Sequence, residues 1–528
     1  PPSANAGTGG AMPLRRIAVL NGSASSDPNT PPLTDTYTWS LVSAPSGSTL
    51  STSSIGFPSS SLAVFRPDVL GNYVFNLKVE NSAGASDAQV TYTAQIFPPV
   101  AEAGKPQNAK TGGFAILNGK DSYDPNGLPL TFAWTFGTLP QGSALNAAAL
   151  RNATTPKPYF KPDVDGVYQL RLVVNNGALD SLADEVLVTA AAGALPPNAN
   201  AGGDRNARVL SQPVPLNGSA SFDANTPPLP LTYLWTFQTL PAGSALTDAQ
   251  IQNASTPGAQ FVPDVAGDFV LNLRVSNTAG FTVDAVTVHA FTGYTQALSA
   301  NVPPNAEAGP DRFALPGTLV TLNASASGDP DGGPLPVGYS WWLNALPATS
   351  TAVLNGPSLA EPTVTPDRTG YYIGRLEVFD GFSSGFSNTL LTAAPPCDVD
   401  ANGTLEQMDL DLLQAAMGRS VGASDPRDPV VNGIVTSEDF TYCQNLVVPP
   451  VLPNAVSAPA SLTFNALRGG ANPPSQSIVV GSSEGDFPFT LSSGETWILT
   501  NPSSGDTSAN LIGVSVDTTG IVAAQSQG

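Results

Sequence analysis

The sequence predicts a mainly β protein built from tandem β-sandwich domains, and three observations lead to this prediction. Charged residues make up only 12% of the 528 residues, while 50 Gly and 51 Pro supply many turns. This composition favours short strands joined by turns over long helices. One corner motif also recurs four times, about a hundred residues apart, and that spacing fits a sandwich domain better than a small solenoid repeat.

The corner motif consists of Pro-Asp, a Gly and an aromatic residue, followed by alternating polar and apolar residues. Pro, Asp and Gly favour a turn, and the alternation that follows predicts a half-buried strand. The aromatic resembles a tyrosine corner, which ties a loop across the end of a sandwich. The four copies are Pro67-Asp68 with Gly71 and Tyr73, Pro162-Asp163 with Gly166 and Tyr168, Pro263-Asp264 with Gly267 and Phe269, and Pro366-Asp367 with Gly370 and Tyr371.

A Pro-Pro segment ending in Ala-x-Ala-Gly opens each repeat, at Pro1, Pro98, Pro196 and Pro303. Each proline ring fixes φ and favours an extended path, so we expect the sandwiches to form a semi-rigid rod. The chain opens on Pro1 without a Met, and we expect a processed or partial product. The predicted domains are sandwiches at 1–97, 98–195, 196–302 and 303–395, a helical module at 396–448 and a partial sandwich at 449–528.

A strand carrying Trp follows an Asn-Gly or Asn-Ala turn in each repeat. An aromatic residue two places before the Trp shares its face of the strand. The expected role of the Trp is to fill the sandwich core, and the alternative is a platform on which a carbohydrate stacks. The four tryptophans are Trp39, Trp134, Trp235 and Trp341.

Together these elements resemble the PKD family of extracellular Ig-like β-sandwiches. The shared features are Ala-x-Ala-Gly, the turn with Asp-Pro, aromatic-x-Trp and the Pro-Asp corner, in one order, over residues 1 to about 394. The segment Trp-Asp-Phe-Gly-Asp-Gly of typical PKD domains is absent. The resemblance implies spacer or ligand-presenting modules without catalysis.

Aspartates gather in the predicted turns of all four repeats. One interpretation is Ca²⁺ held at the domain ends, since loops readily supply the six to eight oxygens that Ca²⁺ takes. The alternative is an Asx turn, in which each carboxylate accepts hydrogen bonds from its own turn. The residues concerned are Asp27, Asp124, Asp223, Asp329 and Asp331, together with Asp68, Asp163, Asp264 and Asp367.

The strongest chemical signal lies at residues 398–409, which fit a twelve-residue Ca²⁺ loop. Such a loop places side-chain oxygens at places one, three and five, a Gly at six, a carbonyl at seven and an acid at twelve. After the loop, apolar residues recur with the spacing of a helix, at Leu410, Leu412, Leu413 and Met417. Gly418 ends this predicted helix. The predicted ligands are Asp398, Asp400, Asn402, Thr404, Glu406 and Asp409.

A second loop at residues 428–439 keeps places one, five, six and twelve, with Asp428, Asn432, Gly433 and Asp439, and Ile434 offering its carbonyl. Place three is Val430, which has no side-chain oxygen, so we expect this site to be weak or empty. The pair of loops resembles a type I dockerin, a duplicated Ca²⁺-loop-helix module. That resemblance implies docking to a cohesin-like partner, and the alternative is a structural clip between the sandwiches.

The chain has two cysteines, one on each side of the paired loops: Cys397 and Cys443. A bridge between them would stabilise the module by roughly 3–4 kcal/mol in the chain-entropy model. It would also indicate an oxidising compartment, either the periplasm or the outside of the cell. The alternative is a pair of buried thiols.

Beyond a second Pro-rich linker, Pro449–Pro453, alternating residues resemble a BACON domain, a bacterial Ig-like sandwich often suggested to bind glycans. The resembling segments are 458–464, 469–480, Trp497-Ile498 and 512–516. The family has one more strand, whereas this chain ends at Ala523–Gly528, and a sandwich without its last strand has an open edge. We therefore expect either a truncated polypeptide or a head-to-tail filament in which a neighbouring copy supplies the strand.

Charge and residue usage exclude several functions. A net charge of −21 disfavours nucleic-acid binding, which needs clustered Lys and Arg. The single histidine, His289, lies in an alternating stretch and is expected on a strand surface rather than in a catalytic triad. No stretch is long and apolar enough to span a bilayer. No phosphate-binding loop or zinc spacing is present, so we expect no enzyme.

Two function classes follow. The first is a secreted bacterial structural or adhesive protein, a Ca²⁺-stabilised series of sandwiches that assembles with copies of itself. The second is a non-catalytic protein that binds glycans or docks to a cohesin-like scaffold. An aromatic strip exposed on the last domain would favour the second class.

Overall fold

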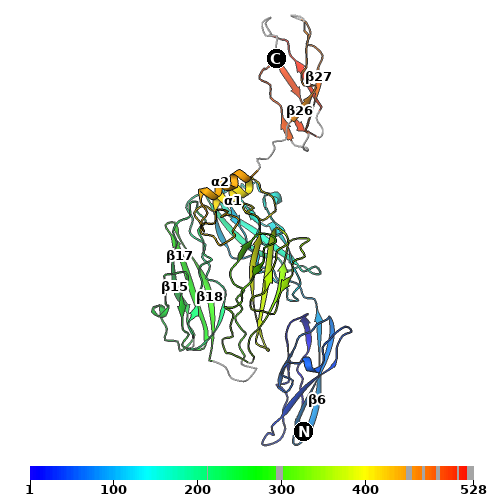
Figure 1. Cartoon of the computed structure of the whole chain (residues 1–528), viewed down its shortest axis with the longest axis vertical. Helices are drawn as coiled ribbons and strands as arrows, with labels where there is room; N and C mark the ends of the chain where they lie inside the picture. Colours follow the sequence, from blue (N-terminus) through cyan, green and yellow to red (C-terminus); the bar gives the residue numbers. More distant parts are fainter. Residues whose placement is uncertain are drawn as a thin grey trace. The chain divides into compact units, whose positions relative to one another are not determined.

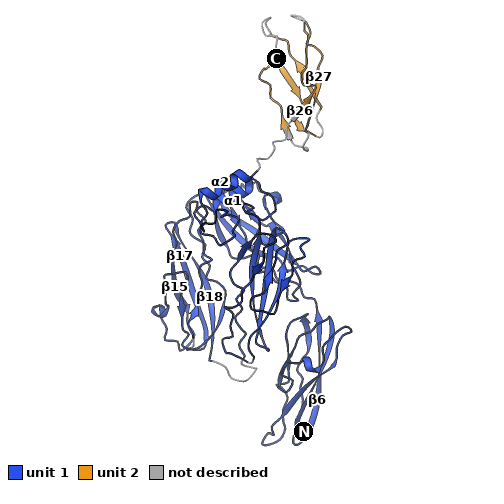
Figure 2. Ribbon diagram, in the orientation of Figure 1, with its two compact units in different colours: residues 1–447 blue, residues 448–528 orange. Residues whose placement is uncertain are grey.

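The computed structural model describes residues 1–210, 212–292, 301–333, 335–447, 455–466, 470–482, 488–507 and 511–519. The chain divides into two compact units, Pro1–Val447 and Val448–Gly528 (Figure 2). The linker predicted at Pro449–Pro453 and the predicted chain end at Ala523–Gly528 lie outside the described residues.

Four β-sandwiches make up most of the first unit. The first sandwich contains β1 (Gly10–Pro13), β2 (Ala18–Asn21), β3 (Thr36–Ser43), β4 (Leu62–Phe65), β5 (Gly71–Asn81) and β6 (Gly84–Gln95), and the second contains β7 (Gln107–Lys110), β8 (Ala115–Ile116), β9 (Thr131–Phe136), β10 (Tyr159–Phe160), β11 (Gly166–Asn175) and β12 (Asp184–Ala191). The third contains β13 (Arg205–Arg208), β14 (Val214–Pro215), β15 (Thr232–Thr239), β16 (Gln260–Phe261), β17 (Gly267–Asn277) and β18 (Gly280–Phe291). The fourth contains β19 (Arg312–Ala314), β20 (Val320–Thr321), β21 (Gly338–Ala345), β22 (Leu354–Asn355), β23 (Thr363–Val364), β24 (Gly370–Phe379) and β25 (Ser384–Ala393). Single 3-10 turns lie at Thr52–Ser54, Ala147–Ala149 and Asp248–Gln250.

Each sandwich repeats one topology. Its main sheet has four strands, in the orders β1-β6-β5-β3, β7-β12-β11-β9, β13-β18-β17-β15 and β19-β25-β24-β21. In each main sheet, the strand that comes first along the chain pairs in parallel with the strand that comes last along the chain, as β1 does with β6. The other pairs are antiparallel. Figure 1 shows β15, β17 and β18 side by side in the third sandwich. The prediction of a mainly β protein with tandem sandwiches is confirmed.

The corner glycines explain why the motif recurs. Gly71, Gly166, Gly267 and Gly370 open a long central strand with φ between +127° and +144°. A Cβ at any of them would lie 2.5–2.8 Å from a proline of the preceding loop, such as Pro140 opposite Gly166. Only glycine combines this backbone conformation with so close an approach.

The tryptophans fill the sandwich cores, as predicted. Trp39 and Trp235 are fully buried, and Trp134 and Trp341 are 3% exposed. In the first three sandwiches the indole N–H donates to a loop carbonyl 3.1–3.2 Å away. Burying the ring while satisfying its N–H is the favourable arrangement for a core tryptophan. These four residues therefore offer no stacking platform for a carbohydrate.

The tyrosine corner is present in three repeats, with one correction to the sequence assignment. The hydroxyls of Tyr73, Tyr168 and Tyr372 donate to the carboxylates of their corner aspartates over 2.8–3.1 Å. In the fourth repeat the corner residue is thus Tyr372 and not Tyr371, because strand alternation directs only every second residue into the core. The third repeat has Phe269 at this place and lacks the hydroxyl.

At Asp124 the carboxylate accepts from backbone N–H groups of its own turn, as the Asx-turn interpretation predicts, whereas Asp68 accepts from Ser48 and Thr49 of a separate loop. Asp124 Oδ1 accepts from the N–H groups of Asn126 and Leu128, both at 3.0 Å. Asp68 accepts from Ser48, Thr49 and Tyr73. Burial raises the pKa of Asp68, but these hydrogen bonds together outweigh burial and hold the pKa below its ordinary value.

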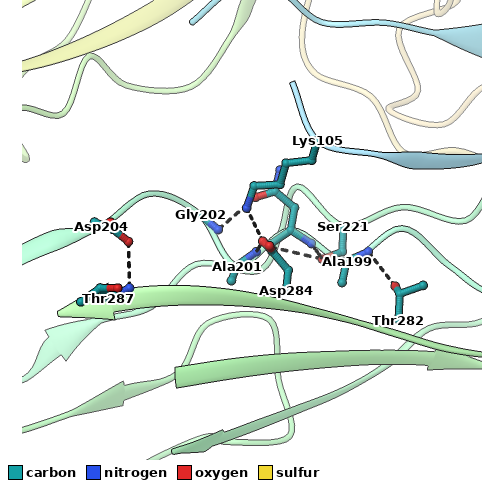
Figure 3. A network of polar contacts seen from close by, with 10 residues as sticks. Lys105, Ala199, Ala201, Gly202, Asp204, Ser221, Thr282, Asp284 and Thr287 are labelled. Atoms are coloured by element: carbon teal, nitrogen blue, oxygen red, sulfur yellow. Dashed lines mark hydrogen bonds and ion pairs between the residues drawn. The ribbon is translucent and has the colours of Figure 1, made fainter. Parts of the chain in front are cut away.

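The Ala-x-Ala-Gly segments are fixed by the last strand of their own sandwich. In the second and third sandwiches an aspartate accepts the N–H of the second alanine over 2.6 Å, Asp184 from Ala103 and Asp284 from Ala201. Asp284 also pairs with Lys105 of the preceding sandwich (Figure 3). Because the Lys105 side chain is 45% exposed, this ion pair contributes little stability, and the backbone hydrogen bond is the stronger constraint.

Two of the joints between sandwiches carry an asparagine lock. Asn198 accepts the N–H of Asn108 over 2.6 Å and donates back to the carbonyl of Asn108 over 3.1 Å. Asn305 makes the same pair of bonds with Asn206, at 2.9 and 2.7 Å. Each lock ties the Pro-rich entry of one sandwich to the first strand of the sandwich before it. The first joint has Val100 at this position and so cannot form the lock.

We expect Asn198→Val, which installs the residue of the first joint, to loosen the second joint. Two partly buried hydrogen bonds disappear and the main chain of Asn108 loses both partners, at a cost of about 1–3 kcal/mol. The amide hydrogen of Asn108 should exchange faster in the variant, while the exchange rates in β5 stay unchanged. Unaltered exchange at Asn108 would contradict the lock.

Contacts also join sandwiches that are not consecutive in sequence. Asn344 of the fourth sandwich donates to the carbonyl of Ser122 over 2.9 Å, and its own carbonyl accepts from Leu130 of the second. Accordingly, nine of the ten residues of β24 are buried, whereas β5 alternates between buried and more exposed residues. The first sandwich contributes Arg66, which bonds both carboxylate oxygens of buried Glu377 at 2.8 and 3.0 Å.

The second unit contains β26 (Ala455–Ala458), β27 (Gln476–Ser482), β28 (Pro488–Thr490), β29 (Ile498–Asn501), β30 (Ser504–Asp506) and β31 (Leu511–Val516). The sheet order is β26-β27-β31-β29, with a separate pair β28-β30. Val480, Ile512 and Val514 form its buried core. Residues 520–528 lie outside the described residues, so the predicted lack of a last strand stays a prediction.

Candidate metal centre

The helical module is a small domain closed by a disulfide. It contains α1 (Gln407–Ala415) and α2 (Ser437–Leu446). Cys397 and Cys443 are both fully buried, and their sulfurs are bonded at 2.04 Å, which confirms the predicted bridge. Leu410, Leu413 and Val435 pack around the bridge. With so few apolar residues, the module depends on the covalent link for much of its stability.

The first loop brings three carboxylates together. One oxygen from each of Asp398, Asp400 and Asp409 lies within 4.8 Å of the others, and the three residues are at most 4% exposed. Among the described residues, no other group of three or more His, Cys, Asp or Glu side chains meets this geometry. Three buried negative charges without a cation repel one another strongly, so the group is suited to holding a metal ion.

The loop backbone holds these carboxylates in place. Asp398 accepts the N–H groups of Asn402 and Gly403 at 3.1 and 2.9 Å. Asp409, in the first turn of α1, accepts from Val399 at 2.8 Å and from Glu406 at 3.0 Å. The sharp turn between them requires Gly403, whose φ is +90°. The donor set is entirely oxygen, and the preformed loop therefore fits a hard cation such as Ca²⁺.

Burial and mutual repulsion change the acidity of the site. Burial, followed by the charges of Asp409 and Asp400, raises the pKa of Asp398 to about 7. Burial, with the charge of Asp400, raises the pKa of Asp409 to about 6 despite the backbone hydrogen bonds that lower it. A divalent cation would reverse both effects because it stabilises the charged forms.

The three other predicted ligands of the first loop lie on its exposed side. Asn402 Oδ1 accepts the N–H of Thr404 at 2.7 Å. Glu406 caps the start of α1 and lies 3.4 Å from the amide nitrogen of Asn402. These side chains face solvent next to the buried triad. Their role as ligands stays a prediction.

The second loop has the same backbone and fewer oxygens. Asp428 accepts from the N–H groups of Asn432 and Gly433 at 3.0 and 2.7 Å, just as Asp398 does in the first loop. Asp439 accepts from Val430 and Thr436. Ile434 is 46% exposed, and its N–H donates to Asn432 Oδ1. With Val430 at place three, carboxylates occupy only two of the ligand places in this loop, those of Asp428 and Asp439.

Residues outside the module complete the environment of Asp400, and the sequence analysis missed them. The Tyr159 hydroxyl of the second sandwich donates to Asp400 Oδ2 over 2.7 Å. The Asp400 carbonyl accepts from Asn152 of the same sandwich at 2.8 Å and from the Tyr371 hydroxyl of the fourth at 3.0 Å. Burial and the bond to Asp400 raise the pKa of Tyr159 above its ordinary value. The only sequence signal was that the pair Tyr371-Tyr372 offers one Tyr in addition to the corner residue.

Comparison with known protein families gives a match for one part of the chain. Residues 6–93 match the family model described as K319L-like, PKD domain. No curated protein matches the chain. None of the helices in the described residues is long and apolar enough to cross a membrane.

Three solved structures match parts of this chain. The crystal structure of Drosophila N-cadherin EC1-4 is 11% identical, with a TM-score of 0.27, over 68% of this chain and 93% of that chain. The four N-terminal Ig domains of Dscam1 isoform 6.44 are 12% identical, with a TM-score of 0.21, over 74% and 99%. The PKD domain from KIAA 1837 protein is 26% identical, with a TM-score of 0.15, over 18% and 85%.

All three TM-scores are low, so the fold rests on the strand orders given above. The comparisons extend the resemblance to neither a dockerin nor a BACON domain. What they support is a first repeat that is similar to a PKD domain.

Proposed function

We propose that this protein is an extracellular structural or adhesive protein in which Ca²⁺ and a disulfide fix a helical module against the β-sandwiches. One observation carries the proposal: Asp400 belongs to the buried triad and is also bonded by Tyr159 and Tyr371 of two different sandwiches. A cation held by this triad would therefore order the loop and the surfaces that contact it.

Ca²⁺ is the cation that the loop suits best. Ca²⁺ takes six to eight oxygens in flexible geometry, whereas Mg²⁺ demands a strict octahedron and retains its water. Asp398, Asp400 and Asp409 supply the charge, and we propose that Asn402, Glu406 and the Thr404 carbonyl complete the shell. The second loop, lacking an oxygen at place three, should bind Ca²⁺ more weakly.

Within the dockerin-like interpretation we favour an internal clip over docking to a cohesin-like partner. The first loop is already covered by Asn152 and Tyr159 of the second sandwich and by Tyr371 of the fourth. A partner that used this surface would have to displace those bonds. The disulfide supports a location outside the bacterial cytoplasm, because such bonds persist in oxidising compartments.

A non-catalytic role agrees with the surroundings of His289. Its Nδ1 lies 2.8 Å from Asp268 Oδ1 on the surface of the third sandwich, and both side chains are more than a third exposed. A catalytic base needs a nucleophile within reach and an oriented, partly enclosed ring. This pair resembles an ordinary cross-strand contact.

We further propose that copies of the chain associate through the second unit. Val479, Leu499 and Leu511 are 44–66% exposed, and strand pairing places them on the outward face of one sheet. An exposed apolar surface of this kind is typical of protein–protein contacts. The exposed large apolar residues of the described part of this unit are aliphatic, which disfavours stacking on a glycan.

Electron microscopy of the purified full chain, with Ca²⁺ and with chelator, tests the proposal. We expect ordered assemblies in Ca²⁺ at high concentration, fewer after chelation, and none for Leu499→Asp combined with Leu511→Asp. Leu182→Asp, at a residue 91% exposed in the second sandwich, is the matched control and should assemble normally. Monodisperse particles under every condition would contradict self-association and favour a cohesin-like or glycan partner.

A further inference from the structure

A cavity of about 390 Å³ lies where three sandwiches and the helical module meet. Its lining includes Lys157 of the second sandwich, Phe222 of the third, Phe313 of the fourth and Arg419 of the module. A volume of this size falls within the range of small-molecule sites, which often lie at the junctions of domains.

The cavity is basic although the chain is acidic. Four of the 20 Lys and Arg residues line it, against a single acidic residue, Asp400, in a chain with net charge −21. Two of these cations already have partners. Lys110 donates to the carbonyls of Ala192 and Gly193, and Arg427 forms a salt bridge with Asp425 at 2.6 Å.

The other two cations lack counter-ions. No hydrogen bond or ion pair joins the Lys157 ammonium to any of the described residues. Arg419 donates one N–H to the carbonyl of Asp223 at 3.1 Å, while its Nε is buried without a partner. Burial lowers the pKa of both side chains. Both residues are half-buried, and partly desolvated cations without an ion pair are costly, so an anion in the cavity would lower that cost.

Aromatic rings form part of the wall around these cations. Phe222, Phe313 and Tyr371 line the cavity, and the Arg427 guanidinium lies 5.8 Å from the centre of the Phe313 ring. Aromatic faces bind apolar bodies and other rings, while a few polar groups fix the orientation of a ligand. The site is therefore better suited to a ring that carries a charge than to an inorganic ion.

We propose that this cavity binds a small ring-containing carboxylate, whose charged group meets Lys157 and Arg419 and whose ring lies against Phe222 and Phe313. Such a ligand would contact three sandwiches and the module at once, and would stabilise their junction.

Titration calorimetry on the full chain in Ca²⁺ tests the inference with D-glucuronate and benzoate as probes. These probes represent a saturated and an aromatic ring with one carboxylate. We expect at least one of them to bind with one-to-one stoichiometry, and D-glucose and sulfate to bind at least tenfold more weakly. Equal binding of glucose or of sulfate, or binding of neither carboxylate, would overturn the proposal.

Variants separate the cavity from the rest of the surface. Lys157→Met and Arg419→Met should each weaken probe binding roughly ten- to a hundredfold, the usual effect of losing a charge-assisted hydrogen bond. Lys78→Met, at an exposed lysine paired with Glu80, is the control and should bind normally. Without ligand, Lys157→Met should melt at or above the temperature of the parent, since no ion pair is lost. Undiminished binding in both cavity variants would refute the assignment.

Discussion

Asp398→Asn is expected to abolish the Ca²⁺-dependent part of the stability of the first unit. An ion that binds only the folded state adds about 2.7 kcal/mol when its concentration is a hundred times the dissociation constant. The variant lacks one charged ligand of the ion, so it should lose this Ca²⁺-dependent increase in the free energy of unfolding. In chelator the melting temperature of the variant should equal or exceed that of the parent, because one of three mutually repelling carboxylates is gone. Calorimetric melting in Ca²⁺ and in EDTA measures both effects.

The chain provides a matched control for this experiment. Asp428→Asn disturbs the same two loop hydrogen bonds in the second loop, to Asn432 and Gly433. Because this variant keeps the triad of the first loop, its melting temperature should rise with Ca²⁺ almost as much as that of the parent. Equal losses in the two variants would show that the loop hydrogen bonds, and not the cation, account for the effect.

Replacing both cysteines with serine is expected to cost the helical module about 4 kcal/mol. The bridge closes a loop with a sequence separation of 46 residues, and the chain-entropy model assigns this amount to a loop of that length. The double variant avoids leaving a single reactive thiol. Hydrogen exchange should show α1 and α2 opening more often, while β5 of the first sandwich keeps its protection.

Reductant gives an independent check on the same bridge. Dithiothreitol should destabilise the parent module and leave the double serine variant unaffected. If the variant protected α1 and α2 as well as the parent does, the apolar packing around Leu413 would be sufficient and the bridge dispensable.

The repeating parts of the fold could be predicted because each follows from local chemistry. The corner glycines need a left-handed backbone, the tryptophans need a core, and the loop around Gly403 needs oxygens at fixed places. The cysteines could be paired because the sequence contains only two. These features depend on residues close in sequence or on residue types with few possible roles.

Contacts between distant parts of the chain could not be predicted in this way. Tyr159 lies 241 residues from Asp400, and no pattern in either segment indicates that they meet. Tyr371 was assigned to the corner because it directly follows Gly370, but strand alternation gives that place to Tyr372. The asparagine locks were also missed, since an Asn after Pro-Pro is equally consistent with a simple turn.

The position of the disulfide has a mechanical consequence. Tension along the backbone that enters at Cys397 can leave at Cys443 directly through the sulfur bridge, so the segment between them, which spans a sequence separation of 46, carries none of the load. At roughly 3.3–3.6 Å per residue, about 150 Å of contour length is thereby withheld from stretching. A pulled molecule would keep both loops of the module folded while the sandwiches around them extend.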